Sequence, residues 1–211
     1  MVNQALIDTF AEKARAVSAQ IHPVTSMEEA LDHVVQACVR KEACQVLSPG
    51  CEFPVSDPAR ELCELKTWEK LIAAPGLNGT VLESLAGRCR EAGIGLIDRG
   101  LHAYTGGIDV GFTFADAGIA ETGSLVLNCA SEDLRLATMV SEVHIALLRA
   151  GDIYAQAYDL EAMLADSFSR APGFTAFITG PSRTADIERV LSLGVHGPLA
   201  LHVLILDPKE A

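Results

Sequence analysis

The chain has 211 residues, of which 49% are hydrophobic, and its formal net charge is −12 at pH 7. This length suits one large domain or two small ones, and the hydrophobic content is that of a globular protein. The negative charge disfavours nucleic acid and anionic membrane surfaces as partners, because both require a basic footprint. An anionic substrate remains compatible, since an acidic protein can contain a local basic pocket.

The sequence gives no sign of membrane insertion or secretion. No apolar run reaches the roughly 18 residues typical of a membrane-spanning helix. The N-terminal stretch MVNQALIDTFAEKARAVSAQ lacks a basic segment followed by an apolar one, so it does not read as a secretory signal. We therefore expect a cytoplasmic protein.

Residues 1–40 predict two amphipathic helices, and a capping box of Ser26 and Glu29 predicts where the second begins. The stretch 48–58 is dense in Pro, Ser and Gly and predicts a loop. We interpret 1–40 as an N-terminal helical appendage and 41–211 as the main domain.

Short apolar runs alternate with amphipathic stretches through the rest of the chain. This alternation predicts an α/β fold with a largely parallel sheet, and FTAFIT and HVLILD predict strands covered on both faces. The predicted strands are ACQVL, KLIAAPG, GIGLID, GIDVGFTFA, GIAETGSLVLNC, VHIALLRA, FTAFITG and LALHVLILD, and the predicted helices are GTVLESLAGRCREAG, DLEAMLADSFSR and ADIERVLSLG.

The cysteines show no C-x-x-C pair, and no histidine pair stands at zinc-finger spacing. This pattern predicts no metal site and no iron–sulfur cluster held by this chain. We expect reduced, mostly buried thiols; the alternative is one reactive thiol, best represented by Cys51 in its Gly- and Pro-flanked loop. The cysteines are Cys38, Cys44, Cys51, Cys63, Cys89 and Cys129.

The turn GPSRT follows a predicted strand at 174–179 and precedes a predicted helix. Ligands of α/β sheets gather at the carboxyl ends of strands, where a helix N-terminus offers N–H groups to an anion. Gly180 opens the turn, Ser182 and Thr184 add hydroxyl donors, and Arg183 adds a guanidinium that can grip a carboxylate or phosphate. The alternative is a helix cap with no ligand.

A second turn, GVHGPLALHV, places His196 between two glycines. An imidazole with a pKa of about 6.5 suits a proton carrier, so His196 is a candidate acid or base. The alternative is a structural loop histidine.

Glu121 occupies the centre of AETG within an apolar run. Alternation along a strand places Glu121 and Gly123 on one face, and Thr122 and Ser124 on the other. Small residues on both faces indicate that backbone or ligand approaches closely, so we place Thr122, Gly123 and Ser124 beside a substrate. A carboxylate there needs a partner. Glu121 is therefore either half of an ion pair with an arginine such as Arg183, or an acid, base or nucleophile at a pocket.

Fingerprints of common nucleotide and hydrolase sites are absent from the sequence. It contains no G-x-G-x-x-G, no G-x-x-x-x-G-K-[ST] and no G-x-S-x-G. It therefore offers no evidence for NAD or ATP as a cofactor.

The segments ADAGIAETGSLVL and TGPSRTADIERVLSLGVHGPLALHVLILD resemble the LUD-domain family, in particular its lactate-utilisation protein C (LutC/YkgG) branch. The resemblance covers 40–211 and departs at Ser141 and Glu142, where it leads us to expect prolines. It implies a three-layer α/β/α fold similar to the NagB/RpiA/CoA-transferase group. It also implies a role in oxidising lactate to pyruvate alongside two partner proteins that carry the iron–sulfur clusters, with no cofactor in this chain.

Three functions remain open. In the first, a subunit of a lactate-oxidising system binds a small carboxylate through Arg183, and Glu121 or His196 accepts the hydroxyl proton. In the second, a free-standing enzyme acts on a phosphorylated sugar, a folate or an acyl-CoA, with Glu121 as nucleophile in the CoA-transferase version. In the third, the chain is a non-catalytic regulatory or assembly module. The oligomeric state is also open, with a homo-oligomer among the alternatives.

Overall fold

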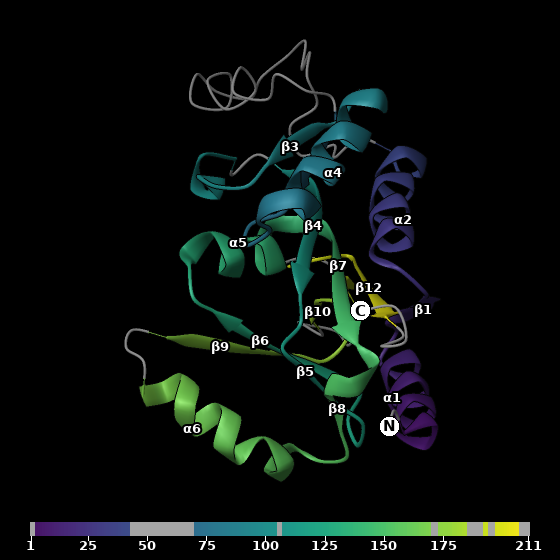
Figure 1. The fold of residues 1–211 in the computed structure, drawn as a ribbon, viewed down its shortest axis with the longest axis vertical. Helices are drawn as coiled ribbons and strands as arrows, with labels where there is room; N and C mark the ends of the chain where they lie inside the picture. The colour runs from purple at the N-terminus through teal and green to yellow at the C-terminus, as the bar shows by residue number, and fades with distance from the viewer. Residues whose placement is uncertain are drawn as a thin grey trace.

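The computed structural model describes residues 3–42, 70–104, 107–169, 173–184, 192–193 and 197–206. These residues form a larger and a smaller β-sheet with helices packed around them (Figure 1). The larger sheet has six strands in the order β1-β12-β7-β4-β2-β3, and every neighbouring pair is parallel, which confirms the predicted α/β class. Its strands are β1 (Gln20–Val24), β2 (Leu71–Ala73), β3 (Gly95–Ile97), β4 (Ile108–Phe114), β7 (Ser141–Arg149) and β12 (Ala200–Leu206).

The helices cover the sheets from several sides. Among the described residues, none of them is both long enough and apolar enough to span a bilayer. The α-helices are α1 (Gln4–Ala16), α2 (Met27–Arg40), α4 (Gly79–Glu91), α5 (Glu132–Val140) and α6 (Glu161–Ser169), and the short 3-10 helices are η2 (Leu101–Tyr104), η3 (Ala150–Asp152) and η4 (Ala157–Leu160).

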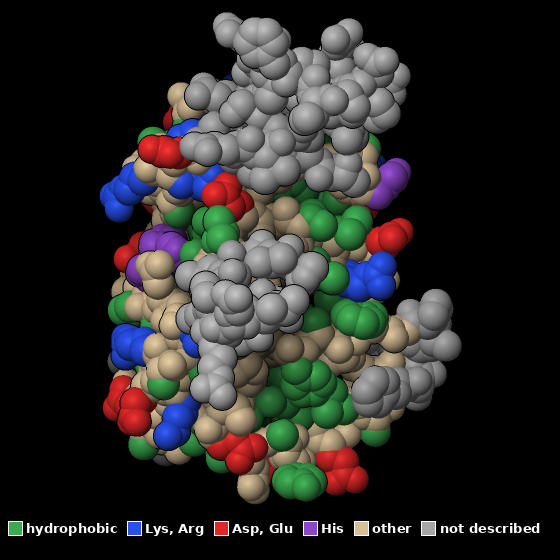
Figure 2. All heavy atoms as spheres, turned by 180° about the vertical axis from the view of Figure 1, so that it is seen from behind, with side chains coloured by type: hydrophobic (Ala, Val, Ile, Leu, Met, Phe, Trp, Pro, Cys, Tyr) green, Lys and Arg blue, Asp and Glu red, His purple; other side chains and the backbone are tan. Residues whose placement is uncertain are grey.

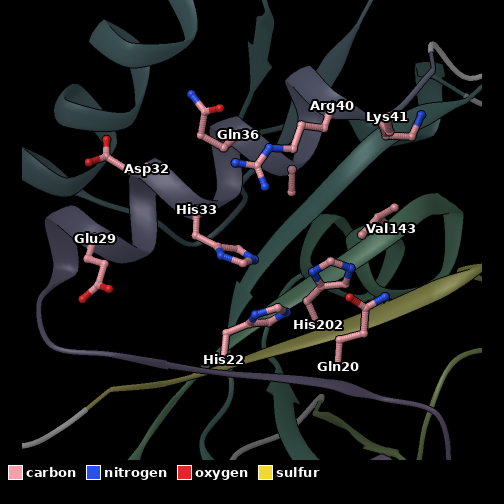
Figure 3. Close-up of a pocket in the computed structure, with 11 residues that line it drawn as sticks. Gln20, His22, Glu29, Asp32, His33, Gln36, Arg40, Lys41, Val143 and His202 are labelled. Atoms are coloured by element: carbon pink, nitrogen blue, oxygen red, sulfur yellow. The ribbon is translucent and has the colours of Figure 1, made fainter.

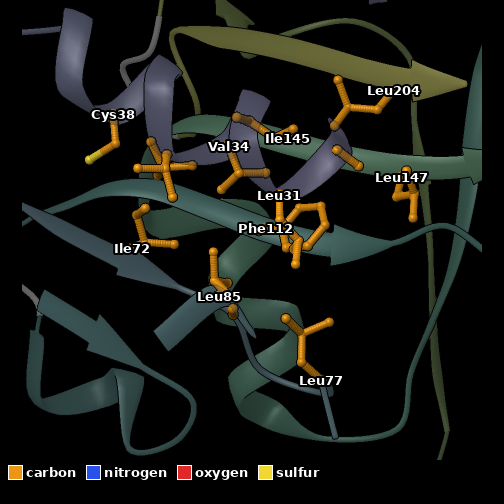
Figure 4. Packing of buried hydrophobic residues seen from close by; sticks show 14 of the residues in the cluster. Leu31, Val34, Cys38, Ile72, Leu77, Leu85, Phe112, Ile145, Leu147 and Leu204 are labelled. Atoms are coloured by element: carbon orange, nitrogen blue, oxygen red, sulfur yellow. The ribbon is translucent and has the colours of Figure 1, made fainter. Parts of the chain in front are cut away.

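The larger sheet is buried on both faces. Alternate side chains of a strand point to opposite sides, so Ile145 of β7 packs in the cluster formed with α2 and α4, whereas Ala146 packs with α1 and the smaller sheet. Figure 4 shows the first cluster, in which Leu31 and Val34 of α2 lie against Phe112 of β4. Parallel sheets need this cover on both sides, which explains the nearly continuous apolar runs in the sequence.

The smaller sheet has the strand order β8-β5-β6-β9, with β5 (Ala117–Ile119), β6 (Ser124–Cys129), β8 (Ile153–Tyr154) and β9 (Phe174–Ile178). Its centre is a β5–β6 antiparallel hairpin. The prediction of one strand through GIAETGSLVLNC is therefore wrong, because the chain reverses at 120–123. Gly123 adopts a φ of +66°, which other residues rarely adopt, and Glu121 lies exposed on the turn.

Strand β9 does not have the double cover that FTAFIT predicted. It forms the edge of the smaller sheet, and Phe174 and Phe177 are 48% and 51% exposed. Figure 2 shows hydrophobic side chains gathered on the surface in the half of the molecule that holds this sheet. An apolar run thus identified the strand without identifying its place in a sheet. The same expectation for HVLILD is confirmed, since Leu204 of β12 packs in one cluster and Val203 and Ile205 pack in the other, on the opposite face of the sheet.

The two helices predicted in 1–40 are confirmed as α1 and α2, but β1 lies between them. Strand β1 pairs in parallel with β12 and forms an edge of the larger sheet, where Pro23 is tolerated. The described residues of this segment therefore supply an edge strand to the larger sheet as well as the two helices.

Some predictions, in 43–69 and near the C-terminus, fall wholly or partly outside the described residues. The strand ACQVL and the loop 48–58 lie outside it. The helix ADIERVLSLG is wrong where the structure describes it, because Ser192–Leu193 forms strand β11, which pairs antiparallel with β10 (Arg183–Thr184).

Candidate functional site

The exposed Glu121 forms hydrogen bonds with backbone groups of Ala155 and Ala157. Its Oε1 accepts a hydrogen bond from the Ala157 N–H at 2.9 Å, and its own N–H donates to the Ala155 carbonyl at 3.1 Å. Within the described residues, its hydrogen-bond partners are these backbone groups and not the arginine considered above. The carboxylate therefore ties the β5–β6 turn to the start of η4.

The AETG and GPSRT segments do meet in space. Thr122 Oγ1 lies 2.7 Å from Ser124 Oγ, which lies 2.6 Å from Thr179 Oγ1. Thr179 directly precedes the GPSRT turn, so a chain of three hydroxyls joins the two segments. The antiparallel pairing of β6 with β9 brings the two segments together.

Both segments also pack against the C-terminal end of α1. A Cβ atom on Gly123 would lie 2.2 Å from the Ala14 nitrogen, and one on Gly180 would lie 2.3 Å from the Val17 carbonyl oxygen. The Arg183 guanidinium donates a hydrogen bond to that same Val17 carbonyl. A cation at a helix C-terminus complements the helix dipole, so these contacts are ones that stabilise the fold.

Of the remaining residues of the predicted site, the structure describes Ser182 and Thr184 but not His196. The Ser182 N–H donates to the Pro198 carbonyl at 2.9 Å, which joins the GPSRT turn to the glycine-rich turn before β12. Thr184 belongs to β10, and His196 lies outside the described residues. Substrate binding by the two segments stays a prediction, and the cavity described next is lined by other residues.

A cavity of about 600 Å³ lies between α2 and the strands β1, β7 and β12 (Figure 3). The sequence analysis named none of the residues around it as site candidates. Its polar lining consists of Gln20, His22, Glu29, Asp32, His33, Gln36, Arg40, Lys41 and His202.

Three histidines converge at this cavity from separate elements. In the β1–β12 register, Gln20 lies opposite His202, and His22 lies two residues further along β1. Paired and alternate residues share a face, so His22 and His202 both point toward α2, which supplies His33. The ring centroids are 4.4 Å apart for His22 and His33, 5.2 Å for His22 and His202, and 5.8 Å for His33 and His202.

Burial makes these imidazoles weak bases. Desolvation lowers the pKa of His202 to about 4, with His22 and His33 adding to the effect. Desolvation also lowers the pKa of His22, helped by Arg15, and that of His33, helped by His22 and Arg40 and opposed by Glu29. All three rings are therefore neutral at pH 7, and each carries one nitrogen lone pair.

Hydrogen bonds at the start of α2 fix Glu29, and His33 lies one helical turn after Glu29. Ser26 Oγ accepts the Glu29 N–H at 3.2 Å, as the capping-box prediction requires. The Glu29 carboxylate does not return to Ser26; it accepts the N–H of Thr25 at 2.7 Å and its hydroxyl at 2.8 Å.

The other end of the cavity contains an ion-pair network. Lys41 Nζ lies 2.8 Å from Asp109 and 2.8 Å from Glu142, and Asp109 also accepts the Leu71 N–H at 2.8 Å. Desolvation lowers the pKa of Lys41, but its bonds to the two carboxylates raise that pKa above its ordinary value overall. Glu142, one of the two residues where the family resemblance suggested proline, thus forms an ion pair with Lys41.

Three cysteines are described, and all are buried as predicted. Desolvation raises the pKa of Cys38 to about 12 and that of Cys89 to about 11, so both thiols stay protonated. Cys129 is also buried, while Cys44, Cys51 and Cys63 lie outside the described residues.

Comparison with known proteins gives the family. The LUD domain model matches residues 7–206. The chain is 36% identical to the uncharacterized protein YkgG of Escherichia coli over 97% of this chain and 80% of that protein. It is 33% identical to lactate utilization protein C of Shouchella clausii over 48% of this chain and 45% of that protein. It is 36% identical to the uncharacterized protein NMB1437 of Neisseria meningitidis over 49% of this chain and 44% of that protein, so each of the last two matches spans under half of the relative.

The fold has a solved counterpart. A DUF162 family protein from Deinococcus radiodurans superposes with a TM-score of 0.61 over 96% of this chain and 97% of that one, at 14% identity. At that identity the likeness concerns the fold alone. The family model spans nearly the whole chain, and the similarity to YkgG extends over nearly the whole chain as well. The chain therefore belongs to the LUD-domain family.

Proposed function

We propose that this chain is a component of a lactate-utilisation system that oxidises lactate to pyruvate together with iron–sulfur partner proteins. Similarity to lactate utilization protein C supports the choice of lactate. The structural observation that carries the proposal is the cavity between α2 and β1, β7 and β12. It joins a guanidinium, Arg40, to a group of neutral imidazoles.

The lining of this cavity matches the two ends of an α-hydroxy acid. Arg40 offers a guanidinium to the carboxylate, and Gln20 and Gln36 offer amide groups beside it. The imidazole end offers nitrogen lone pairs to the hydroxyl group. A volume of about 600 Å³ exceeds that of lactate, which leaves room for a partner segment or solvent in the same space.

Oxidation of lactate to pyruvate releases two electrons and two protons. In this proposal the electrons pass to iron–sulfur clusters of the partner proteins, since the cysteine spacing of this chain suits no cluster. The hydroxyl proton leaves through the polar lining of the cavity and the C2 proton passes to solvent. The role of this chain is to bind and orient the acid while the clusters accept the electrons.

The direct test is binding of L-lactate and pyruvate by calorimetry, first to the purified chain and then to its complex with the partners. Arg40→Gln should weaken binding at least tenfold, which is about 1.4 kcal/mol. Arg90→Gln removes an exposed arginine of α4 that is remote from the cavity lining and should bind as the unaltered chain does. Absence of binding in both preparations contradicts the proposal.

The same binding experiment also tests the GPSRT turn as the alternative lactate site. Arg183→Ala should leave lactate affinity unchanged if the cavity holds the acid. Loss of binding in Arg183→Ala with normal binding in Arg40→Gln would move the substrate to the GPSRT turn.

A non-catalytic assembly module is the second candidate, favoured by the hydrogen bonds that Glu121 and Arg183 make with backbone groups of the fold. The two candidates separate in a reconstituted complex that transfers electrons from lactate to a dye. Arg40→Gln should lower the rate of dye reduction if the chain binds substrate, and should leave it unchanged if the chain only holds the partners together.

A further inference from the structure

The three histidines of the cavity present their ring nitrogens to a common point. One ring nitrogen of each histidine lies within 4.8 Å of those of the other two. Figure 3 shows the rings of His22, His33 and His202 turned toward one another, while Glu29 and Asp32 point away. The three residues come from β1, α2 and β12, so the convergence is a product of the fold and not of local spacing.

Each of these histidines has one ring nitrogen without a protein partner in the described part of the chain. The atoms His22 Nε2, His33 Nε2 and His202 Nδ1 are buried and make no hydrogen bond there. A buried polar atom without a hydrogen-bond partner is destabilising, and here three such atoms lie side by side. A ligand that satisfies all three at once removes the cost.

We propose that His22, His33 and His202 bind a divalent first-row transition-metal ion, with Zn²⁺ as the reference ion. Imidazole nitrogens are preferred ligands of zinc, copper, nickel and iron, and disfavour magnesium and calcium. Three protein ligands leave at least one coordination position, which faces the cavity and is open to an oxygen ligand. The sequence predicts no metal site, because these three histidines do not stand at the short spacing of local metal-binding motifs.

The dimensions suit such an ion. Zinc–nitrogen bonds of about 2.0–2.1 Å at tetrahedral angles place the ligand nitrogens about 3.3 Å apart. The separations of up to 4.8 Å exceed this value, so metal binding requires the three rings to move closer together; they border cavity space.

The charged side chains around the histidines are of both signs. Glu29 and Asp32 line the same cavity, and Glu29 lies one helical turn before His33. Arg40 and Lys41 oppose them; Lys41 is paired with Asp109 and Glu142, and Asp32 is paired with Arg88. The whole chain carries a net charge of −12, which attracts cations at long range.

The inference shares its cavity with the proposed function but does not require lactate, so its test uses metal alone. The tag-free full-length chain is stripped with a chelator and titrated with Co²⁺ and Zn²⁺ in the absence of lactate. We expect one ion per chain, with visible Co²⁺ absorption bands of a nitrogen-ligated, low-symmetry site. X-ray absorption at the zinc edge should show three imidazole ligands at about 2.0 Å.

Variants assign the ligands. His33→Gln and His202→Gln should each weaken metal binding by more than tenfold, since losing even an outer partner of a ligand costs about 10–100-fold. His102→Gln removes an exposed histidine of η2 and should bind metal normally. Circular dichroism of each variant checks that the fold is retained, and the absorption spectrum of the unaltered chain tests the inference even if a variant fails to fold.

Three results would overturn this assignment: no stoichiometric binding at micromolar metal, unchanged affinity in His33→Gln and His202→Gln, or sulfur ligands in the absorption spectrum. A chain that binds Zn²⁺ but not lactate would reject the proposed function and keep the metal site. A chain that binds lactate but not Zn²⁺ would do the reverse.

Discussion

The Lys41 ammonium lies 2.8 Å from the Asp109 carboxylate, whose side chain is fully buried in the sheet. Asp109 also accepts the backbone N–H of Leu71. Lys41, which follows the C-terminal end of α2, is thereby linked to the central strands β4 and β2. Lys41 also lines the cavity that contains the three histidines.

Replacing Lys41 by Met should destabilise the protein by about 3 kcal/mol, because the buried carboxylate loses its cationic partner. Urea unfolding measures the loss. Lys13→Met removes an exposed lysine of α1 and should cost less than about 1 kcal/mol. Adding Asp109→Asn to Lys41→Met should cost less than the sum of the single changes; additive costs would show that the pair is not coupled.

Gly123→Ala should destabilise the protein by at least about 2 kcal/mol. The residue has a φ of +66°, and a Cβ atom would lie 2.2 Å from the Ala14 nitrogen of α1, which is backbone and cannot move alone. Gly87→Ala in α4 should instead stabilise the protein by about 0.5–1 kcal/mol. Nothing lies within 4 Å of the Cβ position of this residue, and alanine favours the helix. Thermal unfolding of both variants checks the contrast, and a stable Gly123→Ala would refute the close approach to α1.

His144 should make stability depend on pH. Its side chain is 1% exposed, its Nε2 lies 2.8 Å from Thr113 Oγ1, and desolvation lowers its pKa to about 4. In the unfolded chain that pKa is about 6.5, so between these values the unfolded state binds a proton that the folded state does not. The stabilising effect is complete above pH 6.5 and is lost as the pH falls to 4.

The size of this effect is roughly 3 kcal/mol between pH 7 and pH 4. Unfolding free energies of the unaltered chain and of His144→Gln, measured across this range, isolate it. The unaltered chain should lose more stability on acidification than the variant does. Parallel curves would mean that His144 does not titrate in the way its burial implies.

Arg183→Ala should lower stability by about 1 kcal/mol, because the Val17 carbonyl at the end of α1 loses a charged donor. Arg183→Lys should restore part of the loss, since a cation remains at the helix terminus. Differential scanning calorimetry gives both values. An unchanged melting temperature in Arg183→Ala would leave this residue free for the ligand role that the sequence predicted.

Much of the secondary structure could be predicted from the sequence because it depends on neighbours along the chain. The apolar runs at 108–114 and 200–206 identified β4 and β12, and helical periodicity with a capping Ser26 identified α2. The same local signals failed at AETG, where small residues suit a strand and a turn equally well. They also failed at QIHPV, where Pro23 hid a strand that an edge position tolerates.

The histidine cavity could not be predicted, because nothing near His22, His33 or His202 in the sequence points to the other two. By itself the sequence determined many of the elements, the α/β class and the family, since those follow from the period of apolar residues and from motifs along the chain. Only the tertiary structure decided which residues share a site. The β1–β12 register and the packing of α2 on the larger sheet are interactions between distant segments, and these bring the three imidazoles together.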